Sequence, residues 1–131
     1  MDTRTFLLVD ANPAYRAILR AIVRSEPSWS IVTESGDGLS AVELAAQYRP
    51  DVILMNIDMP VMSGLEATRQ IRRTSHSAHI ILFSSHRDEE FHYASLAAGG
   101  DYYLSQEHID NQTLTSLIGR LSFFVKGHAH A

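Results

Sequence analysis

The chain has 131 residues, with 11 basic and 15 acidic side chains and a formal net charge of −4. This length is typical of one domain, which buries about two-thirds of the surface that its unfolded chain exposes. The acidic balance argues against direct nucleic-acid binding, and the absence of cysteine excludes disulfides and thiolate metal sites.

Membrane attachment and secretion are not expected from this sequence. No apolar run approaches the ~20 residues that a membrane-spanning helix needs. The apolar part of the N-terminal stretch MDTRTFLLVD is too short for a signal peptide. We therefore expect a cytoplasmic protein.

Five short apolar runs along the chain are predicted to form strands. They cover residues 6–9, 31–33, 52–55, 80–83 and 102–104. Runs that are apolar at successive positions are typical of strands buried on both faces of a parallel sheet.

Helical patterns follow each of these runs. The first predicted helix begins after Asn12, the second covers residues 39–46 and the third covers residues 63–73. The fourth begins at residues 88–90, and the fifth covers residues 114–121. Asn12 and Ser63 are good N-cap residues, and Gly99 suits the end of the fourth helix. Strands that alternate with helices in this way predict an α/β fold, with a parallel sheet covered by helices on both faces.

One side of the first predicted helix carries Arg16, Arg20 and Arg24. A row of charges is the ordinary outer face of an amphipathic helix. We therefore interpret this row as a solvent-exposed face rather than a docking surface.

Polar residues stand at the ends of four predicted strands: Asp10, Asn56, Ser84 and Gln106. The carboxyl ends of parallel strands meet at one edge of a sheet, where open α/β sheets bind their ligands. We expect these four residues to converge there. From the residues alone, Asp10 is explained equally well as a helix cap, and Ser84 is explained better as a cap or turn residue.

Residues 51–66 read DVILMNIDMPVMSGLE. This stretch resembles the centre of the receiver domains of bacterial response regulators. In that family a strand ends in a phosphoryl-accepting aspartate, which a hydrophobic residue, a variable residue, Met and Pro follow. Here these four are Ile57, Asp58, Met59 and Pro60, and Asn56 stands at the position of the acceptor.

The resemblance covers roughly residues 5 to 125. It implies a flavodoxin-like (βα)5 fold, with a five-stranded parallel sheet in the order 2-1-3-4-5. We assign residues 5–126 to one receiver-like domain. Residues 127–131 are expected to be a disordered tail, which leaves no room for an output domain.

Receiver domains carry an acidic pair after the first strand, the acceptor aspartate after the third, a Ser or Thr after the fourth and a lysine after the fifth. The matching residues here are Asp10 and Ala11, Asn56, Ser84 and Gln106, and the aromatic switch position is Tyr103. The resemblance therefore implies that one acid, the acceptor and the lysine are substituted, whereas the two switch positions, Ser84 and Tyr103, are retained.

These substitutions change the chemistry that the resemblance implies. A carboxamide is a poor nucleophile, so we expect that Asn56 does not accept a phosphoryl group. Ala11 offers no oxygen to the magnesium that the family binds, and Gln106 offers no cation to a phosphoryl oxygen. Asp58 is not expected to rescue the site, because this position contributes its main-chain carbonyl in the family. We therefore expect no cofactor, and only a weak remnant of the metal site at Asp10.

The joint loss of two acids and the lysine is chemically coherent. A lysine kept without its carboxylates would be a poorly paired charge, which costs of the order of several kcal/mol where it is buried. A single substitution at Asn56 would leave Ala11 and Gln106 unexplained. The pattern thus predicts a naturally degenerate receiver.

We interpret the chain as a receiver-like domain of two-component phosphorelay signalling that has lost phosphorylation. It would act as a protein-interaction module and not as an enzyme. By resemblance, a signalling partner meets the face made by the fourth helix, the fifth strand and the fifth helix, and homodimerisation through this face is a hypothesis. Phe91, Phe123 and Phe124 are candidates for an apolar surface there, with core packing equally open for each.

Two alternatives stay open. The first is a conventional phospho-accepting regulator whose acceptor aspartate has been replaced by Asn56. The second is a small-ligand or anion binder at the vacant strand-end pocket, although the sequence has no glycine-rich phosphate loop. The sequence does not indicate the pathway, the oligomeric state or whether the chain belongs to a longer protein.

Other groups of polar residues have simpler interpretations. Ser84, Ser85 and His86 are adjacent, but neighbouring side chains on an extended strand point in opposite directions, so we expect no catalytic pair. His76 and His79 are interpreted as residues of a solvated loop rather than metal ligands.

Overall fold

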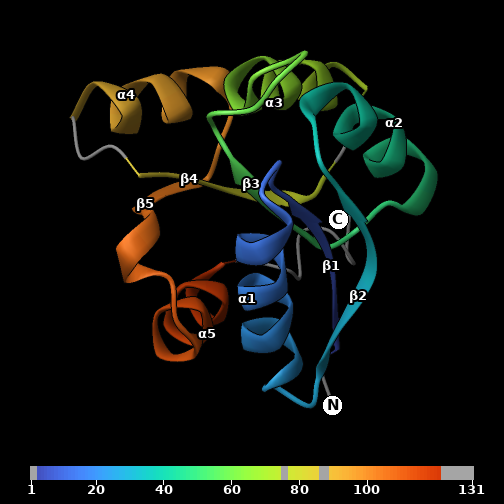
Figure 1. The fold of residues 1–131 in the computed structure, drawn as a ribbon, viewed down its shortest axis with the longest axis vertical. Helices are drawn as coiled ribbons and strands as arrows, with labels where there is room; N and C mark the ends of the chain where they lie inside the picture. Colours follow the sequence, from blue (N-terminus) through green and yellow to red (C-terminus); the bar gives the residue numbers. More distant parts are fainter. Residues whose placement is uncertain (1–2, 75–76, 86–88, 122–131) are drawn as a thin grey trace, which may run out of the picture.

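The computed structural model describes residues 3–74, 77–85 and 89–121. Five parallel strands form one sheet in the order β2-β1-β3-β4-β5 (Figure 1). The strands are β1 (Arg4–Val9), β2 (Trp29–Ser35), β3 (Val52–Asn56), β4 (His79–Ser84) and β5 (Tyr102–Ser105). The helices are α1 (Pro13–Arg24), α2 (Gly38–Tyr48), α3 (Gly64–Arg73), α4 (Glu89–Ala98) and α5 (Asn111–Arg120), with a 3₁₀ turn at Gln106–His108. The predicted α/β fold and strand order are confirmed.

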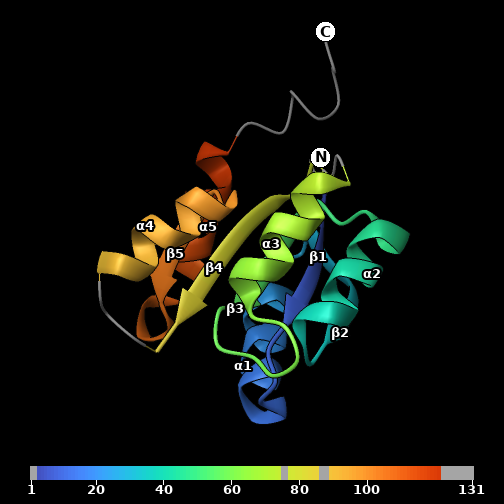
Figure 2. The ribbon, with the colours of Figure 1, turned by 90° about the horizontal axis from the view of Figure 1, so that it is seen from above.

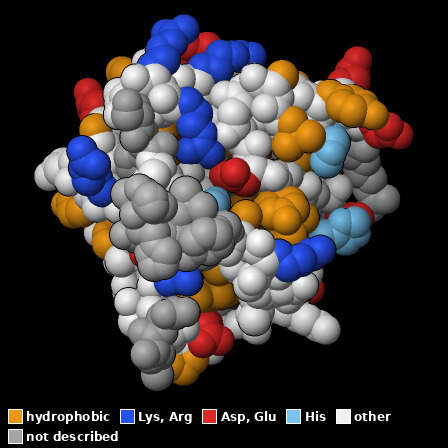
Figure 3. All heavy atoms as spheres, turned by 180° about the vertical axis from the view of Figure 1, so that it is seen from behind, with side chains coloured by type: hydrophobic (Ala, Val, Ile, Leu, Met, Phe, Trp, Pro, Cys, Tyr) orange, Lys and Arg blue, Asp and Glu red, His pale blue; other side chains and the backbone are white. Residues whose placement is uncertain are grey.

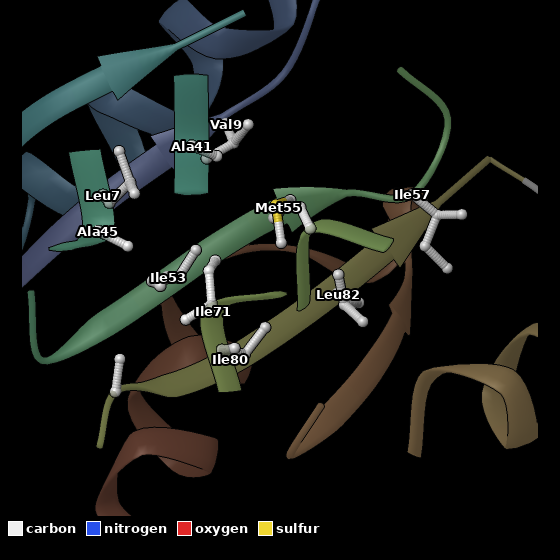
Figure 4. Packing of buried hydrophobic residues seen from close by; sticks show 12 residues of the cluster. Leu7, Val9, Ala41, Ala45, Ile53, Met55, Ile57, Ile71, Ile80 and Leu82 are labelled. Carbon is white, nitrogen blue, oxygen red and sulfur yellow. The ribbon is translucent and has the colours of Figure 1, made fainter. Parts of the chain in front are cut away.

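Helices cover both faces of the sheet: α2, α3 and α4 lie on one face, and α1 and α5 on the other (Figures 1 and 2). Side chains alternate along each strand, so each face has its own buried apolar cluster. On the first face, Figure 4 shows Leu7 and Val9 of β1 beside Ala45 and Ala41 of α2. Phe6 belongs to the cluster on the other face. Burial on both faces is the reason why the strands are apolar at successive positions.

Helix ends form where their sequences predict. Asn12 Oδ1 accepts a hydrogen bond from the amide of Ala14, and Ser63 Oγ accepts one from the amide of Glu66. These caps satisfy amides that have no partner inside the helix. After α4, Gly99 adopts a φ of 110°, a conformation that residues with side chains disfavour.

All five strands are longer than the apolar runs that predict them. Polar residues at the strand ends still pair with neighbouring strands, as Arg4 does with Trp29 and Ser84 with Ser105. Main-chain hydrogen bonding does not require an apolar side chain, which is why hydropathy alone underestimates the length of the strands. The 3₁₀ turn at Gln106–His108 was not predicted.

Two members of the arginine row on α1 make ion pairs with β2 that the sequence did not predict. Arg20 donates two hydrogen bonds to Glu34 on β2, at 2.6 and 2.8 Å, and Arg16 donates one at 3.1 Å. The hydrogen bond from Arg20 is the main cause that lowers the pKa of Glu34. Of the three arginines, Arg24 alone is exposed. The side chains of Arg16 and Arg20 stay 22% and 33% exposed while they pair with Glu34. Helical periodicity did not predict this pairing, because it carries no information about charges on a neighbouring strand.

Several predictions fall outside the described residues. They are those for the tail at residues 127–131, for Phe123 and Phe124, and for His76 and His86. Within the part of the chain that the structure describes, no helix is long and apolar enough to cross a membrane.

The parallel register brings the carboxyl ends of the strands to one side of the sheet, here called the strand-end edge. Asn56 pairs with Phe83, and Ser84 pairs with Ser105. Asp10 follows β1 directly, and its amide donates a hydrogen bond to the carbonyl of Ser35, the last residue of β2.

Two glycines let the loop between β3 and α3 pack closely at this edge. A Cβ atom on Gly38 would lie 2.2 Å from the carbonyl oxygen of Met62, and one on Gly64 would lie 2.3 Å from that of Asn56. In the same loop Val61 has a φ of 69° and is 80% exposed. Close packing and an unusual backbone conformation therefore fix the path of the chain beside Asn56.

Candidate functional site

Asp10 is a buried carboxylate at the strand-end edge, with 2% of its surface exposed. Its Oδ1 accepts a hydrogen bond from the amide of Asn12 at 2.8 Å, and its Oδ2 accepts one from Asn56 Nδ2 at 3.2 Å. The same side chain therefore caps the turn into α1 and contacts the residue at the acceptor position.

Asn56 forms hydrogen bonds through both ends of its amide group. While Nδ2 donates to Asp10, Oδ1 accepts from the amide of Asp58 at 2.9 Å. The Asp58 side chain reaches β4, where its Oδ2 accepts a hydrogen bond from Ser84 Oγ at 3.1 Å. A continuous series of hydrogen bonds thus runs from Asp10 through Asn56 and Asp58 to the fully buried Ser84. The resemblance gives Asp58 a main-chain role, and the structure also brings its side chain to Ser84.

Gln106 reaches the strand-end edge through its main chain. Its carbonyl oxygen accepts a hydrogen bond from the hydroxyl of Tyr15 on α1, at 3.2 Å. Burial, and then the negative charge of Asp10, raises the pKa of Tyr15 to about 12. Ala11, the other substituted position, is exposed and ends in a methyl group. Beside Tyr15 and Gln106 lies a cavity of about 240 Å³, which Ser85, Ser105 and Glu107 also line.

Two residues near Asp10 were not identified from the sequence. Tyr15 hydrogen-bonds Gln106, and Arg16 Nη1 donates to the main-chain carbonyl of Asp10 at 2.6 Å. Both lie in the first turns of α1, and the Asn12 cap that starts this helix was the available signal. Capping predicts where a helix begins but not which side chains of its first turns face the sheet.

The switch position Tyr103 is half-buried and packs against the apolar cluster on the face of α2 and α3. Its ring centroid lies 6.3 Å from that of His92 on α4. Tyr102 belongs to the cluster on the opposite face. The two neighbouring tyrosines therefore face opposite sides of the sheet, as their positions on a strand predict.

The outer surface of α4 carries exposed apolar side chains. Tyr93 is 65% exposed and Leu96 is 46% exposed. Figure 3 shows hydrophobic and histidine side chains close together on the side of the molecule where α4 and β5 lie. Phe91, the candidate named from the sequence, is half-buried and packs against the core. Apolar residues occur all around α4, so helical spacing did not separate its buried side from its exposed side.

The residues at the strand-end edge do not fit the magnesium site that the family implies. Both oxygens of Asp10 already accept hydrogen bonds, and Asn56 turns its NH₂ group, not its oxygen, toward Asp10. Ala11 has no side-chain oxygen. Among the described residues, no group of three or more His, Asp or Glu side chains is arranged to hold a metal ion.

Known proteins resemble this chain in both sequence and fold. Residues 6–118 match the model of the response regulator receiver domain. The nitrate/nitrite response regulator protein NarL of Escherichia coli is 34% identical over 116 residues, which are 88% of this chain and 54% of that protein. The transcriptional regulatory protein DegU of Brevibacillus brevis is 36% identical over 101 residues, 77% of this chain and 43% of that protein. The chemotaxis protein CheY of Halobacterium salinarum is 38% identical over 100 residues, 76% of this chain and 82% of that protein.

Solved structures agree with this assignment. A two-component response regulator of the LuxR family from Aurantimonas superposes with a TM-score of 0.83 at 30% identity, covering 90% of this chain and 84% of that one. The chain spans about half the length of the DegU and NarL relatives. The receiver model nevertheless covers most of the chain, and the strand order agrees with the fold that the resemblance implies. The chain therefore belongs to the receiver domain family of two-component response regulators.

Proposed function

We propose that this receiver domain does not accept a phosphoryl group at Asn56 and acts in the cytoplasm as a protein-interaction module, without enzymatic activity. The observation that carries the proposal is the hydrogen bonding of Asn56, whose amide donates to Asp10 and accepts from the amide of Asp58. The polar groups of these residues at the strand-end edge are thereby hydrogen-bonded to one another.

The chemistry of a carboxamide supports this proposal. Formation of an acyl phosphate needs a nucleophilic carboxylate oxygen, and the neutral amide of Asn56 is a poor nucleophile. The two substitutions at Ala11 and Gln106 remove an oxygen ligand and a cation from the same edge. One replacement at Asn56 would not produce all three features. The alternative of a conventional regulator with an altered acceptor therefore needs two further explanations.

The proposed interaction surface is the face of α4, β5 and α5. Tyr93 and Leu96 supply exposed apolar area on α4, and exposed apolar patches on soluble proteins commonly mark protein contacts. Within this face, the ring of Tyr103 on β5 contacts the ring of His92 on α4. A signalling protein is the proposed partner, and a second copy of this chain is the partner to test first.

The test of phosphorylation is an intact-mass measurement after incubation with acetyl phosphate and magnesium. We would compare the unchanged chain, the variant Asn56→Asp, and a triple variant that adds Ala11→Asp and Gln106→Lys. We expect no phosphoryl group on the unchanged chain or on the single variant, because two other groups are still missing. The triple variant restores the acid pair, the acceptor and the lysine, and we expect it to gain one phosphoryl group.

Two outcomes would contradict the proposal. A phosphoryl group on the unchanged chain would show that another residue accepts it. Ready phosphorylation of Asn56→Asp would show that Ala11 and Gln106 do not impair the edge, and would favour a conventional regulator whose acceptor has been replaced. An aspartate codon in the natural gene would support that second reading independently.

A further inference from the structure

Arg49, directly after α2, adopts a left-handed backbone conformation, with a φ of 47° and a ψ of 58°. Its amide donates a hydrogen bond to the carbonyl of Ala45 and so closes the helix. Glycine is the usual residue where a helix ends in this way, because a Cβ atom makes the left-handed conformation unfavourable. The helix end explains the conformation, but it does not explain the choice of arginine.

Contacts within the chain do not explain this choice either. The side chain of Arg49 is exposed and makes no hydrogen bond or ion pair with a described residue. Asp51, two residues further on, accepts hydrogen bonds from the amide and the hydroxyl of Thr5, at 2.8 and 3.1 Å. The helix dipole favours a basic residue at this end of α2, but Gln47 would serve equally well for that with a helical backbone. An arginine kept in an unfavourable conformation therefore indicates a role outside the chain.

A second exposed arginine ends the neighbouring helix. Helices α2 and α3 begin side by side, because Gly38 lies so close to Met62 that a Cβ atom would be 2.2 Å from its carbonyl oxygen. The two helices pack together and have similar lengths, 11 and 10 residues, so they also end side by side (Figures 1 and 2). Packed helices have axes about 8–10 Å apart. We call Tyr48, Arg49 and Arg73, at these two ends, the helix-end surface.

The part of the molecule around α3 is basic, although the whole chain has a net charge of −4. Arg69, Arg72 and Arg73 lie close together on this helix, and Figure 3 shows basic side chains gathered at the top of the molecule, over α3. Ion pairs neutralise two of the three, since Arg69 pairs with Glu66 and Arg72 pairs with Asp101. The third, Arg73, is exposed at the end of the helix.

The charge of Arg73 is not neutralised by Glu66, the carboxylate that it influences. Hydrogen bonds from Gln70 and then from Arg69 are the main causes that lower the pKa of Glu66, and the charge of Arg73 contributes least. Both oxygens of Glu66 already accept these hydrogen bonds, each at 3.1 Å. Arg73 itself has no described carboxylate within ion-pair distance. The helix-end surface therefore carries two positive charges without an opposite charge beside them among the described residues.

An anionic partner suits this surface, and the charge of the rest of the molecule decides its kind. A membrane surface or a nucleic-acid duplex extends far beyond three residues and would also meet the net negative charge of the chain. A short acidic segment of a protein contacts the helix-end surface alone. Its carboxylates match the paired N–H donors of a guanidinium group, and Tyr48, which is 44% exposed, offers apolar area beside them.

We infer that the helix-end surface binds a short acidic segment of a protein partner, with one carboxylate on Arg49 and another on Arg73. The inference goes beyond the interaction proposed for α4, β5 and α5, because it concerns the ends of two other helices. It depends neither on that face nor on whether Asn56 accepts a phosphoryl group. The domain would then contact partners through two separate surfaces.

The test is a titration of the ¹⁵N-labelled chain, followed by the amide resonances of Tyr48, Arg49 and Arg73. The probe is a capped peptide of six glutamates, and a capped peptide of six glutamines is its neutral analogue. Phosphatidylserine vesicles and a short DNA duplex represent the two other kinds of anionic surface. We expect saturable shifts at the three residues with the glutamate peptide, weakened by added salt, and no binding of the other three probes.

Arg49→Gly separates binding from stability. Glycine relieves the left-handed conformation and removes the guanidinium group. We therefore expect the melting temperature to rise by about 2–4 °C, while the glutamate peptide binds about tenfold more weakly. Arg73→Gln should weaken binding by a similar factor. Arg24→Gln is the matched control, because Arg24 is also an exposed arginine at a helix end but lies on α1, on the other face of the sheet. It should bind the peptide as the unchanged chain does.

Several results would overturn the inference. One is the absence of saturable shifts with the glutamate peptide, or equal binding of the glutamine peptide. Another is normal binding by Arg49→Gly or Arg73→Gln, or an equal loss in Arg24→Gln, which would show a response to net charge alone. Tighter binding of the vesicles or the duplex would exclude an acidic protein segment as the preferred partner. A lower melting temperature of Arg49→Gly would show that Arg49 serves the fold itself.

Discussion

At the scale of single residues, the amide of Asn56 determines how the strand-end edge is held together. Its NH₂ group donates to the buried carboxylate of Asp10, and its oxygen accepts from the amide of Asp58. A carboxylate at this position could only accept hydrogen bonds, and it would place a second negative charge next to Asp10. Replacing one NH₂ group by oxygen would therefore turn an attraction into a repulsion.

We predict that Asn56→Asp lowers the free energy of unfolding by about 1–3 kcal/mol at neutral pH. Repulsion from Asp10 raises the folded-state pKa of one of the two carboxyl groups above its unfolded value. The folded variant then binds more protons than the unfolded chain, so its deficit in stability should shrink as the pH falls toward about 4. Urea unfolding of the unchanged chain and the variant across this pH range measures the effect.

Asn56→Ala is the control for this measurement, because it removes both hydrogen bonds without adding a charge. We expect it to lose stability without the additional pH dependence. An Asn56→Asp variant as stable as the unchanged chain at neutral pH would show that the edge tolerates two adjacent carboxylates without a cation.

Tyr15 is predicted to titrate with a pKa of about 12, above its ordinary value of 10.0, mainly because of burial and then because of Asp10. Its folded-state pKa is raised, so its contribution to stability is complete below about pH 10 and is lost as the pH rises through 12. The phenolate absorbance of the unchanged chain minus that of Tyr15→Phe should give this late titration. A difference curve centred near pH 10 would contradict the burial of the Tyr15 hydroxyl.

The sequence located some residues of the strand-end edge and missed others for a physical reason. Asp10, Asn56 and Ser84 come at the ends of buried strands, so strand prediction alone places them on one side of a parallel sheet. The side chain of Asp58 and the hydroxyl of Tyr15 reach this edge through loop geometry and helix rotation. Neither property leaves a pattern in hydropathy.

At the scale of elements, glycines show where packing allows a side chain and where it does not. Gly119 lies in α5, and a Cβ atom there would meet nothing within 4 Å. Gly64 begins α3, where a Cβ atom would lie 2.3 Å from the carbonyl oxygen of Asn56. The same substitution should therefore have opposite effects at the two positions.

We predict that Gly119→Ala raises the free energy of unfolding by about 0.5–1 kcal/mol, because alanine loses less backbone entropy on folding into a helix. Gly64→Ala should lower it by about 1–3 kcal/mol or more, because the loop after β3 has to move away from the new methyl group. Thermal or urea unfolding of both variants provides the comparison. Equal effects at the two sites would contradict the close packing of this loop.

Element prediction succeeded where the signal is local and failed where the contact is distant in sequence. Caps at Asn12 and Ser63 were predictable from a few neighbouring residues. Arg72, near the end of α3, hydrogen-bonds the carbonyl of Gly99 and the carboxylate of Asp101, which lie 27 and 29 residues away. These contacts join α3 to the turn between α4 and β5, and no short stretch of sequence contains both partners.

At the scale of the whole molecule, β5 connects the strand-end edge with the proposed interaction surface. Its last residue, Ser105, lines the cavity at the edge, while Tyr103 two positions earlier contacts His92 on α4. A protein bound to the face of α4, β5 and α5 would therefore contact a strand that ends at the strand-end edge. In other receivers phosphorylation supplies the bias between two states, and here a partner bound to this face would have to supply it.

The proposed interaction surface leads to a prediction about the oligomeric state of the chain. If a second copy of this chain is the partner, two identical faces meet around a twofold axis, and Tyr93 and Leu96 lie within the contact. We expect sedimentation of the unchanged chain at tens of micromolar to give the mass of a dimer, and Leu96→Glu to give that of a monomer. Leu39→Glu is the matched control, because Leu39 is exposed to the same degree, 45% against 46%, but lies on α2. It should remain a dimer. A monomer mass for the unchanged chain, or a dimer that survives Leu96→Glu, would exclude this mode of self-association, and the apolar surface of α4 would then be available to a different signalling protein.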